Sequence, residues 1–333
     1  MCLSLLPSSS IRDIPVSTFE KKNKHYLHQF FTPPPDSPLS TSEKDYLHHL
    51  LQDFKLSVTA LNTYLNCPYK FKLNNLYRLP RTKEPHLAFG TAIHQALEKF
   101  HLSYQQTDKL PTLDFLLKAF KHALSQEILS PGDHRSRLRY GRQILTDYYH
   151  FHQQDFTPAL KTEKHFGASA YSRCYLNDIP LTGKIDRIDL TSPSSKSVRI
   201  VDYKTGRLKT KGQINGTTKD SDGSLKRQLI FYQLLSQLDK RFPYQVKSVE
   251  LDFVEAPHKK QKSGRTSFRI SSQEVSDLKK TITATFSRIR QLKFPRTQDY
   301  SHCQRCQFKQ HCWPQGIPQN QHQPVQKNNK KKK

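Results

Sequence analysis

The sequence predicts an α/β fold in which a central mixed β-sheet is flanked by helices on both faces and preceded by an N-terminal helical lobe. Three observations carry this prediction. Apolar residues recur at helical spacing through much of residues 56–156, β-branched and alternating segments begin near residue 160, and helical patterns return after residue 224. Because strands and helices follow one another in the second half, we expect one sheet with helices packed against it.

Length and composition set the domain organisation. At 333 residues, of which 35% are hydrophobic, the chain is long enough for a substantial core. We assign residues 1–55, which include the proline-rich run at 32–38, to a disordered or flexible N-terminal extension. Residues 56–315 form the predicted folded domain, and residues 316–333 form a basic disordered tail.

The charge balance points to a polyanionic partner. The chain has 54 Lys and Arg against 28 Asp and Glu, a formal net charge of +26. Nucleic acid is the first candidate and an anionic membrane surface the second. No stretch approaches the roughly 20 apolar residues of a membrane span, and the N-terminus lacks the basic region of a signal peptide. We therefore expect a cytoplasmic protein with no membrane partner.

Two helices are predicted in the first part of the domain. Ser57 is a candidate N-cap for a helix that ends at Cys67. Cys67 alone would be interpreted as a buried apolar residue. In the next helix, at 89–100, His94 borders the apolar stripe, which by itself predicts a core histidine.

Residues 112–156 predict two further helices. Arginines at positions 135, 139 and 142 fall on one helical face. This face suits phosphate contacts, although a solvated face is the commoner meaning of such a pattern.

Strands follow from about residue 160. Residues 162–166 and 170–176 alternate, and a turn at 177–178 leads into the strand that carries Asp186. We interpret Cys174, which lies within these strands, as a core residue. Two β-branched segments, at 181–190 and 198–206, are separated by a Ser/Pro-rich turn.

The second of these segments places charges in a strand that is apolar on both faces. Asp202 and Lys204 share one face with Val198 and Ile200. One interpretation is a buried Asp/Lys ion pair. The other is a site in which Asp186, Asp202 and Lys204 converge, because two carboxylates suit a hard divalent cation and an ammonium can hold a water molecule.

The remaining elements complete the sheet. Residues 207–222 predict a flexible basic loop, and Ser224 is a candidate cap for a helix on which Gln228 and Tyr232 share a face. A strand pair at 246–255 and 266–270 and a final helix at 272–292 follow.

Four of the six cysteines have metal-ligand spacing. Cys303, Cys306 and Cys312 lie close together in the sequence, and Cys67 is available from the other end of the domain. Four thiolates fit either tetrahedral zinc or a 4Fe-4S cluster, and spacing cannot separate them. In a zinc site, His302 or His311 could replace Cys67.

Five motifs together resemble a known family. They are residues 183–189 (GKIDRID), 202–206 (DYKTG), 90–98 (GTAIHQALE), 228–232 (QLIFY) and the four cysteines. This set resembles the PD-(D/E)XK nuclease superfamily, specifically its RecB/AddB-type exonuclease branch, over residues 56–315. The resemblance implies a restriction-endonuclease-like core.

The resemblance also implies a site. Mg2+ or Mn2+ would be held by His94, Asp186, Asp202 and the carbonyl of Tyr203, and Lys204 would orient or activate the attacking water. The resemblance implies that Gln228 and Tyr232 position the DNA, and that Glu163 is a weaker candidate for the metal. The cysteines would hold a 4Fe-4S cluster, with Zn2+ as the alternative.

The expected function is metal-dependent hydrolysis of DNA phosphodiester bonds in repair or recombination, on single strands or from free ends. The sequence has no Gly-x-x-x-x-Gly-Lys-Ser/Thr phosphate loop, so a separate helicase partner would have to unwind the duplex. The alternative is a non-catalytic nucleic-acid-binding subunit of a helicase–nuclease complex that retains the fold.

Overall fold

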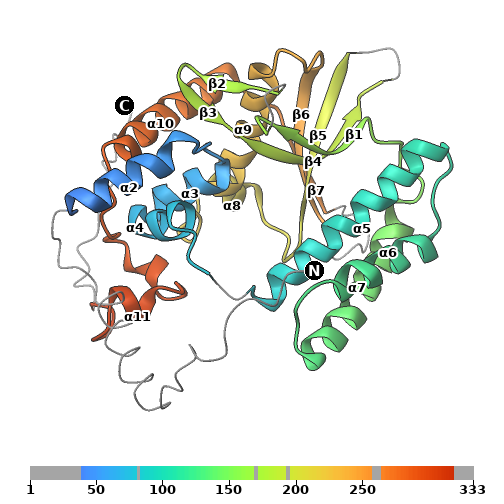
Figure 1. Cartoon of the computed structure of the whole chain (residues 1–333). Coiled ribbons are helices and arrows are strands. Elements are labelled where there is room, and N and C mark those ends of the chain that lie inside the picture. Colours follow the sequence, from blue (N-terminus) through green and yellow to red (C-terminus); the bar gives the residue numbers. More distant parts are fainter. Residues whose placement is uncertain (1–38, 81–82, 169–171, 193–195, 257–263, 319–333) are drawn as a thin grey trace, which may run out of the picture.

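The computed structural model describes residues 39–80, 83–168, 172–192, 196–256 and 264–318. A five-stranded sheet lies at the centre of this part of the chain, with helices on both faces (Figure 1). The predicted fold class, a mixed sheet flanked by helices with N-terminal helices before it, is confirmed.

The sheet has the strand order β1-β4-β5-β6-β7. Its strands are β1 (Lys161–Phe166), β4 (Gly183–Leu190), β5 (Ser197–Lys204), β6 (Gln245–Phe253) and β7 (Arg265–Phe268). β5 and β6 pair in parallel and the other neighbours pair antiparallel. A parallel pair needs a long crossover, and helices α8 (Lys211–Asn215) and α9 (Ser224–Leu238) lie in that connection.

A three-helix layer covers one face of the sheet. It consists of α5 (Pro85–Thr107), α6 (Leu113–Ser125) and α7 (Pro131–His152). These helices share a buried apolar cluster with two residues of β5, Val201 and Tyr203. The predicted alternation of β5 is therefore confirmed, because Val198 and Ile200 belong to the cluster on the opposite face.

The opposite face is covered by α9, α10 (Ser272–Arg290) and the N-terminal elements. The N-terminal elements are α2 (Thr41–Gln52), α3 (Val58–Asn66), α4 (Pro68–Phe71) and the π-helix η1 (Lys72–Leu76). Ser57 caps α3, as predicted, by accepting a hydrogen bond from the amide of Ala60. The last elements, η2 (Tyr300–Cys303) and α11 (Lys309–Cys312), lie beside α4, where the Tyr69 amide donates to the carbonyl of Pro295.

The folded part of the chain begins before the predicted boundary at residue 56. Helix α2 lies inside the range 1–55, and its Leu47 side chain is fully buried in the main core. Residues 1–38 and 319–333, which hold most of the predicted extension and tail, lie outside the described residues.

The strand predicted over 181–190 is divided. β2 (Cys174–Leu176) and β3 (Ile179–Leu181) form a separate two-stranded sheet, and β4 begins after Thr182. At this break the Thr182 hydroxyl donates to the Phe166 carbonyl, and Leu181 bridges to Leu56. Cys174 is buried in the core, as predicted.

Two local predictions after β5 were wrong. The expected loop at 207–222 contains α8, which a capping box at Thr210 and Gln213 initiates. The N-cap of α9 is Gly223 rather than Ser224, because the backbone there has a φ of +69°, a conformation that glycine adopts without steric cost.

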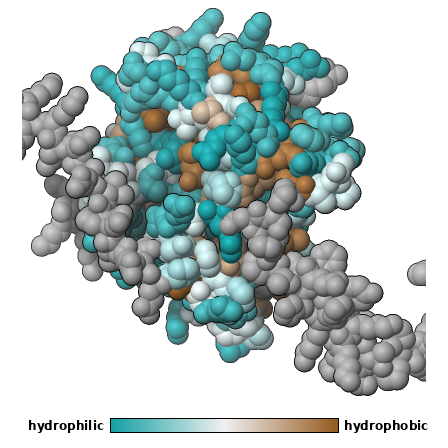
Figure 2. Space-filling model, turned by 90° about the vertical axis from the view of Figure 1, so that its left-hand side faces the viewer, coloured by the Kyte–Doolittle hydropathy of each residue, from teal (hydrophilic) through white to brown (hydrophobic). Residues whose placement is uncertain are grey.

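On the face shown in Figure 2, hydrophilic residues predominate and hydrophobic residues lie in groups among them. Within the described residues, no helix has the length and apolar character needed to span a bilayer.

Candidate active site

A cavity of about 480 Å³ opens at the end of the sheet between α5 and α9. It contains every residue of the predicted catalytic and metal-binding set: His94, Asp186, Asp202, Tyr203, Lys204, Gln228 and Tyr232. These residues come from four elements that are distant in the sequence. The structure therefore brings the whole predicted set together around one space.

The two aspartates are buried at the point where β4 and β5 stop pairing. Arg187 and Val201 form the last ladder pair, and the amide of Tyr203 then donates to Asp186 Oδ2 at 2.8 Å. The carboxylate of Asp186 thus replaces a ladder partner, which satisfies the buried amide and fixes the carboxylate at the cavity wall.

Lys204 makes the ion pair that was the alternative interpretation of this strand. Its ammonium nitrogen lies 2.6 Å from Asp202 Oδ2 and 2.8 Å from Gln228 Oε1. Burial and the nearby Asp186 raise the pKa of Asp202, and the Lys204 ammonium opposes this rise. The Lys204 side chain is 22% exposed and lines the cavity.

The predicted shared face of Gln228 and Tyr232 is confirmed. The Gln228 amide nitrogen lies 3.0 Å from Asp202 Oδ1 and 2.7 Å from the Tyr232 hydroxyl, and that hydroxyl donates to Asp202 Oδ1 at 2.8 Å. Gln228 therefore holds both Asp202 and Lys204 in place, and Tyr232 holds Asp202. Any contact that they make with DNA would come in addition to this role.

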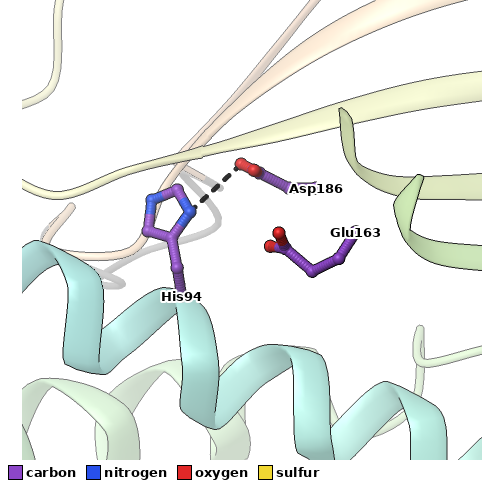
Figure 3. Close-up of side chains that lie close together, drawn as sticks. All are labelled: His94, Glu163 and Asp186. Carbon is purple, nitrogen blue, oxygen red and sulfur yellow. Dashed lines mark ion pairs between the residues drawn. The ribbon is translucent and has the colours of Figure 1, made fainter. Parts of the chain in front are cut away.

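His94 reaches the site from α5. Gly90 lets this helix approach the end of β5, since an added Cβ would lie 2.9 Å from the Thr205 hydroxyl. The His94 Nδ1 atom is 3.3 Å from Asp186 Oδ2 (Figure 3). Burial lowers the pKa of His94, but Asp186 outweighs this effect and raises it overall, while the same contact keeps the pKa of Asp186 low.

Glu163, the weaker metal candidate, lies beside this pair. Its backbone has a φ of +47°, and it falls between the ladder pairs that its neighbours Thr162 and Lys164 make with β4. The flanking pairs place Glu163 opposite Asp186, and Figure 3 shows its carboxylate directed toward His94 and Asp186. One potential ligand atom from each of the three residues lies within 4.8 Å of the others, and no other group of three His, Cys, Asp or Glu in the described residues does so.

Two charged residues of the cavity have no counterpart in the sequence prediction. Lys184, two residues before Asp186, forms an ion pair with Glu163, and Glu98, one helical turn after His94, lines the same wall. Burial lowers the pKa of Lys184, but the carboxylate of Glu163 raises it overall. The spacing of Lys184 from Asp186 and of Glu98 from His94 was the signal available in the sequence.

The cysteines line a second cavity of about 80 Å³. Cys67, at the junction of α3 and α4, lies there with Cys303, Cys306 and Cys312. No three of these sulfur atoms lie within 4.8 Å of one another in the described structure. Burial and the neighbouring thiols raise the pKa of Cys312 to about 12.

The two histidines considered as zinc ligands differ in position. His302 lines this second cavity and contacts Asp299, whereas His311 contacts the Tyr69 hydroxyl at 3.0 Å. Cys67 and His302 both line the cavity, whereas His311 is not among its lining residues.

Comparison with known proteins finds a family and a relative to which this chain is similar. A family model described as the PD-(D/E)XK nuclease superfamily matches residues 55–313. An uncharacterized protein of Rickettsia bellii (strain RML369-C) is 27% identical over 165 residues, which is 48% of this chain. The match covers 20% of that relative's length.

Proposed function

The chain belongs to the PD-(D/E)XK nuclease superfamily, and we propose that it is a Mg2+- or Mn2+-dependent nuclease that hydrolyses phosphodiester bonds of DNA. The observation that carries this proposal is the convergence of Asp186, Asp202 and Lys204 with His94 in one cavity. A net charge of +26 supports a polyanionic substrate.

The donor set at the cavity fits a divalent cation. His94, Glu163 and Asp186 offer one imidazole and two carboxylates from positions close enough to share an ion. In this proposal these three hold the metal, and Asp202 and the Tyr203 carbonyl are additional ligands. The bound ion would supply Lewis-acid stabilisation of the phosphate and a more acidic water.

The protein's own residues have separate roles in the proposed reaction. Lys204 orients the attacking water and stabilises the negative charge that develops on the phosphate. Gln228 accepts a hydrogen bond from the Lys204 ammonium, and Tyr232 donates to Asp202, so both side chains are held before substrate arrives. Such preorganisation lowers the reorganisation cost of the chemical step.

We further propose that the chain belongs to the RecB/AddB-type exonuclease branch. The support is the order of the five sequence motifs, including the histidine of α5 and the Gln-x-x-x-Tyr pattern of α9. The proposed substrates are single strands or free ends in repair or recombination. Because the sequence has no phosphate loop, a separate helicase would supply unwinding.

The second cavity is proposed to hold a 4Fe-4S cluster. The support is that Cys67, Cys303, Cys306 and Cys312 line this one cavity, and that four thiolates are a ligand set of such clusters. Zinc is the competing occupant.

The alternative function, a binding subunit without catalysis, is favoured by one observation. The Lys204 ammonium is engaged by Asp202 and Gln228, as in a structural ion pair. A nuclease needs Lys204 for cleavage, whereas a binding subunit needs Lys204 only for its structural ion pair.

Replacing Lys204 tests the proposal. Lys204→Ala is expected to slow cleavage of an end-labelled single strand in Mg2+ by about 10²-fold or more, because a contact made mainly in the transition state is lost. DNA binding and the melting temperature should stay near wild type. Lys226→Ala is the matched control, since Lys226 is an ion-paired lysine with a 14% exposed side chain outside this cavity, and it should cleave normally.

Three outcomes would decide against this assignment. Wild-type cleavage by Lys204→Ala would remove the catalytic role of this site. Unfolding of both Lys204→Ala and the volume-preserving Lys204→Met would favour the structural ion pair. Tight DNA binding by the wild-type chain without cleavage in Mg2+ or Mn2+ would establish the binding-subunit function.

A further inference from the structure

The cavity contains a second lysine with a different environment. Lys204 lies on the α9 side with Asp202, whereas Lys184 lies beside Glu163 and Glu98, with Asp186 between the two groups. Strands β4 and β5, which carry these lysines, are neighbours in the sheet, and their pairing ends at Arg187 and Val201, before either lysine is reached. The Lys184 side chain is 48% exposed, so its ammonium can reach a bound molecule.

Glu163 takes part in two competing interactions. Its carboxylate forms the ion pair with Lys184 and also belongs to the three-residue group that could hold a cation. A divalent cation on this carboxylate would compete with the ammonium for the same oxygens and repel it electrostatically. Binding of a cation by Glu163 would therefore release Lys184.

A released ammonium at this position needs an anionic partner. Glu98 is nearby, but it is only partly buried, and an ion pair with a solvent-accessible carboxylate stabilises only weakly. The volume of about 480 Å³ falls within the range of pockets that hold drug-sized ligands, so it can hold more than a single phosphate group. With Lys204 at the scissile phosphate, a neighbouring phosphate would lie on the Lys184 side.

From this arrangement we propose that Lys184 is a substrate-binding residue whose ammonium contacts the DNA phosphate next to the scissile one once metal binding has released it from Glu163. The proposal rests on the proposed nuclease function. It makes metal binding and DNA binding cooperative, and by linkage each would strengthen the other by the same factor.

The first test measures binding to a single-stranded oligonucleotide in Ca2+, with the strand checked for integrity. Lys184→Ala should give a log Kd against log salt slope that is shallower than wild type by about 0.7, the value for one lost phosphate contact on a single strand. Lys164→Ala removes the same charge from β1, where the ammonium lies over the Phe166 ring and outside the cavity, and should keep the wild-type slope.

The second test measures binding in EDTA. Glu163→Gln removes the charge that holds Lys184, so this variant should bind the oligonucleotide about tenfold more tightly than wild type without any metal. The double variant Glu163→Gln/Lys184→Ala should lose that gain. Lys184→Arg, which keeps the positive charge, should retain most of the wild-type salt slope.

The outcomes separate this proposal from the proposed function. If wild type cleaves DNA but Lys184→Ala keeps its salt slope and Glu163→Gln shows no gain in EDTA, Lys184 does not bind substrate and the nuclease function stands. If wild type neither binds nor cleaves DNA, both proposals fail together. Melting temperatures near wild type would show that the variants are folded.

Discussion

At the scale of single residues, Arg187 is a buried charged residue next to the candidate active site. Its guanidinium is nearly fully buried, where it donates to Asp189 and to the Tyr203 hydroxyl and lies 2.9 Å from His101 Nε2. Tyr203 in turn provides the amide that holds Asp186. Arg187 therefore connects His101 of α5 to Tyr203, whose amide binds Asp186 at the wall of the candidate active site.

Replacing this residue should be costly. Arg187→Met leaves buried polar partners unsatisfied and is expected to lower the free energy of unfolding by about 3–5 kcal/mol, measured by urea denaturation. Arg199→Met is the matched control, because Arg199 binds the same Asp189 with a side chain that is 32% exposed. Its expected loss is about 1 kcal/mol or less, and equal losses in the two variants would refute the importance of burial.

At the scale of elements, the packing of α7 on α6 depends on a glycine. A Cβ at Gly141 would lie 2.1 Å from the Phe120 ring, so any larger residue there would force Phe120 or the helices to shift. These helices form the layer that supports α5 and therefore His94.

Gly141→Ala is expected to destabilise the domain by about 1–3 kcal/mol in urea denaturation, because overpacking outweighs the gain in helix propensity of about 1 kcal/mol. Gly132→Ala in the same helix is the control, since its nearest new contact would be 3.9 Å away. It should leave stability unchanged or raise it slightly. A stabilised Gly141→Ala variant would mean that Phe120 moves aside easily.

At the scale of the whole molecule, the cysteine cavity joins the two ends of the matched domain. Cys67 follows the first helix of that domain, and the other three cysteines follow its last long helix. A metal group held by all four cysteines would stabilise the folded domain, because the four thiols lie together only when both ends of the domain are folded.

Protein purified without oxygen is therefore expected to contain iron and inorganic sulfide, and Cys312→Ser should lose both and unfold less cooperatively. Elemental analysis and thermal unfolding measure these effects. Cys174→Ala is the control, because this buried cysteine lies in β2 outside the cavity and should keep the iron. Stoichiometric zinc without iron would establish zinc as the occupant.

The sequence alone determined the fold class, the alternating faces of β5, the cap of α3 and the shared face of Gln228 and Tyr232. Each of these depends on periodicity or spacing over a few residues, which the local sequence encodes directly. The same local reasoning identified Asp202 and Lys204 as residues of one face. It left open whether they pair, since that depends on what surrounds them.

Only the tertiary structure decided how the remaining parts meet. It brought Glu163 to His94 and Asp186, paired Lys184 with that glutamate, and began the strand predicted over 181–190 only after Thr182. These features depend on contacts between elements far apart in the chain. Residue spacing cannot specify them, because the free energy that fixes them comes from packing in the assembled domain.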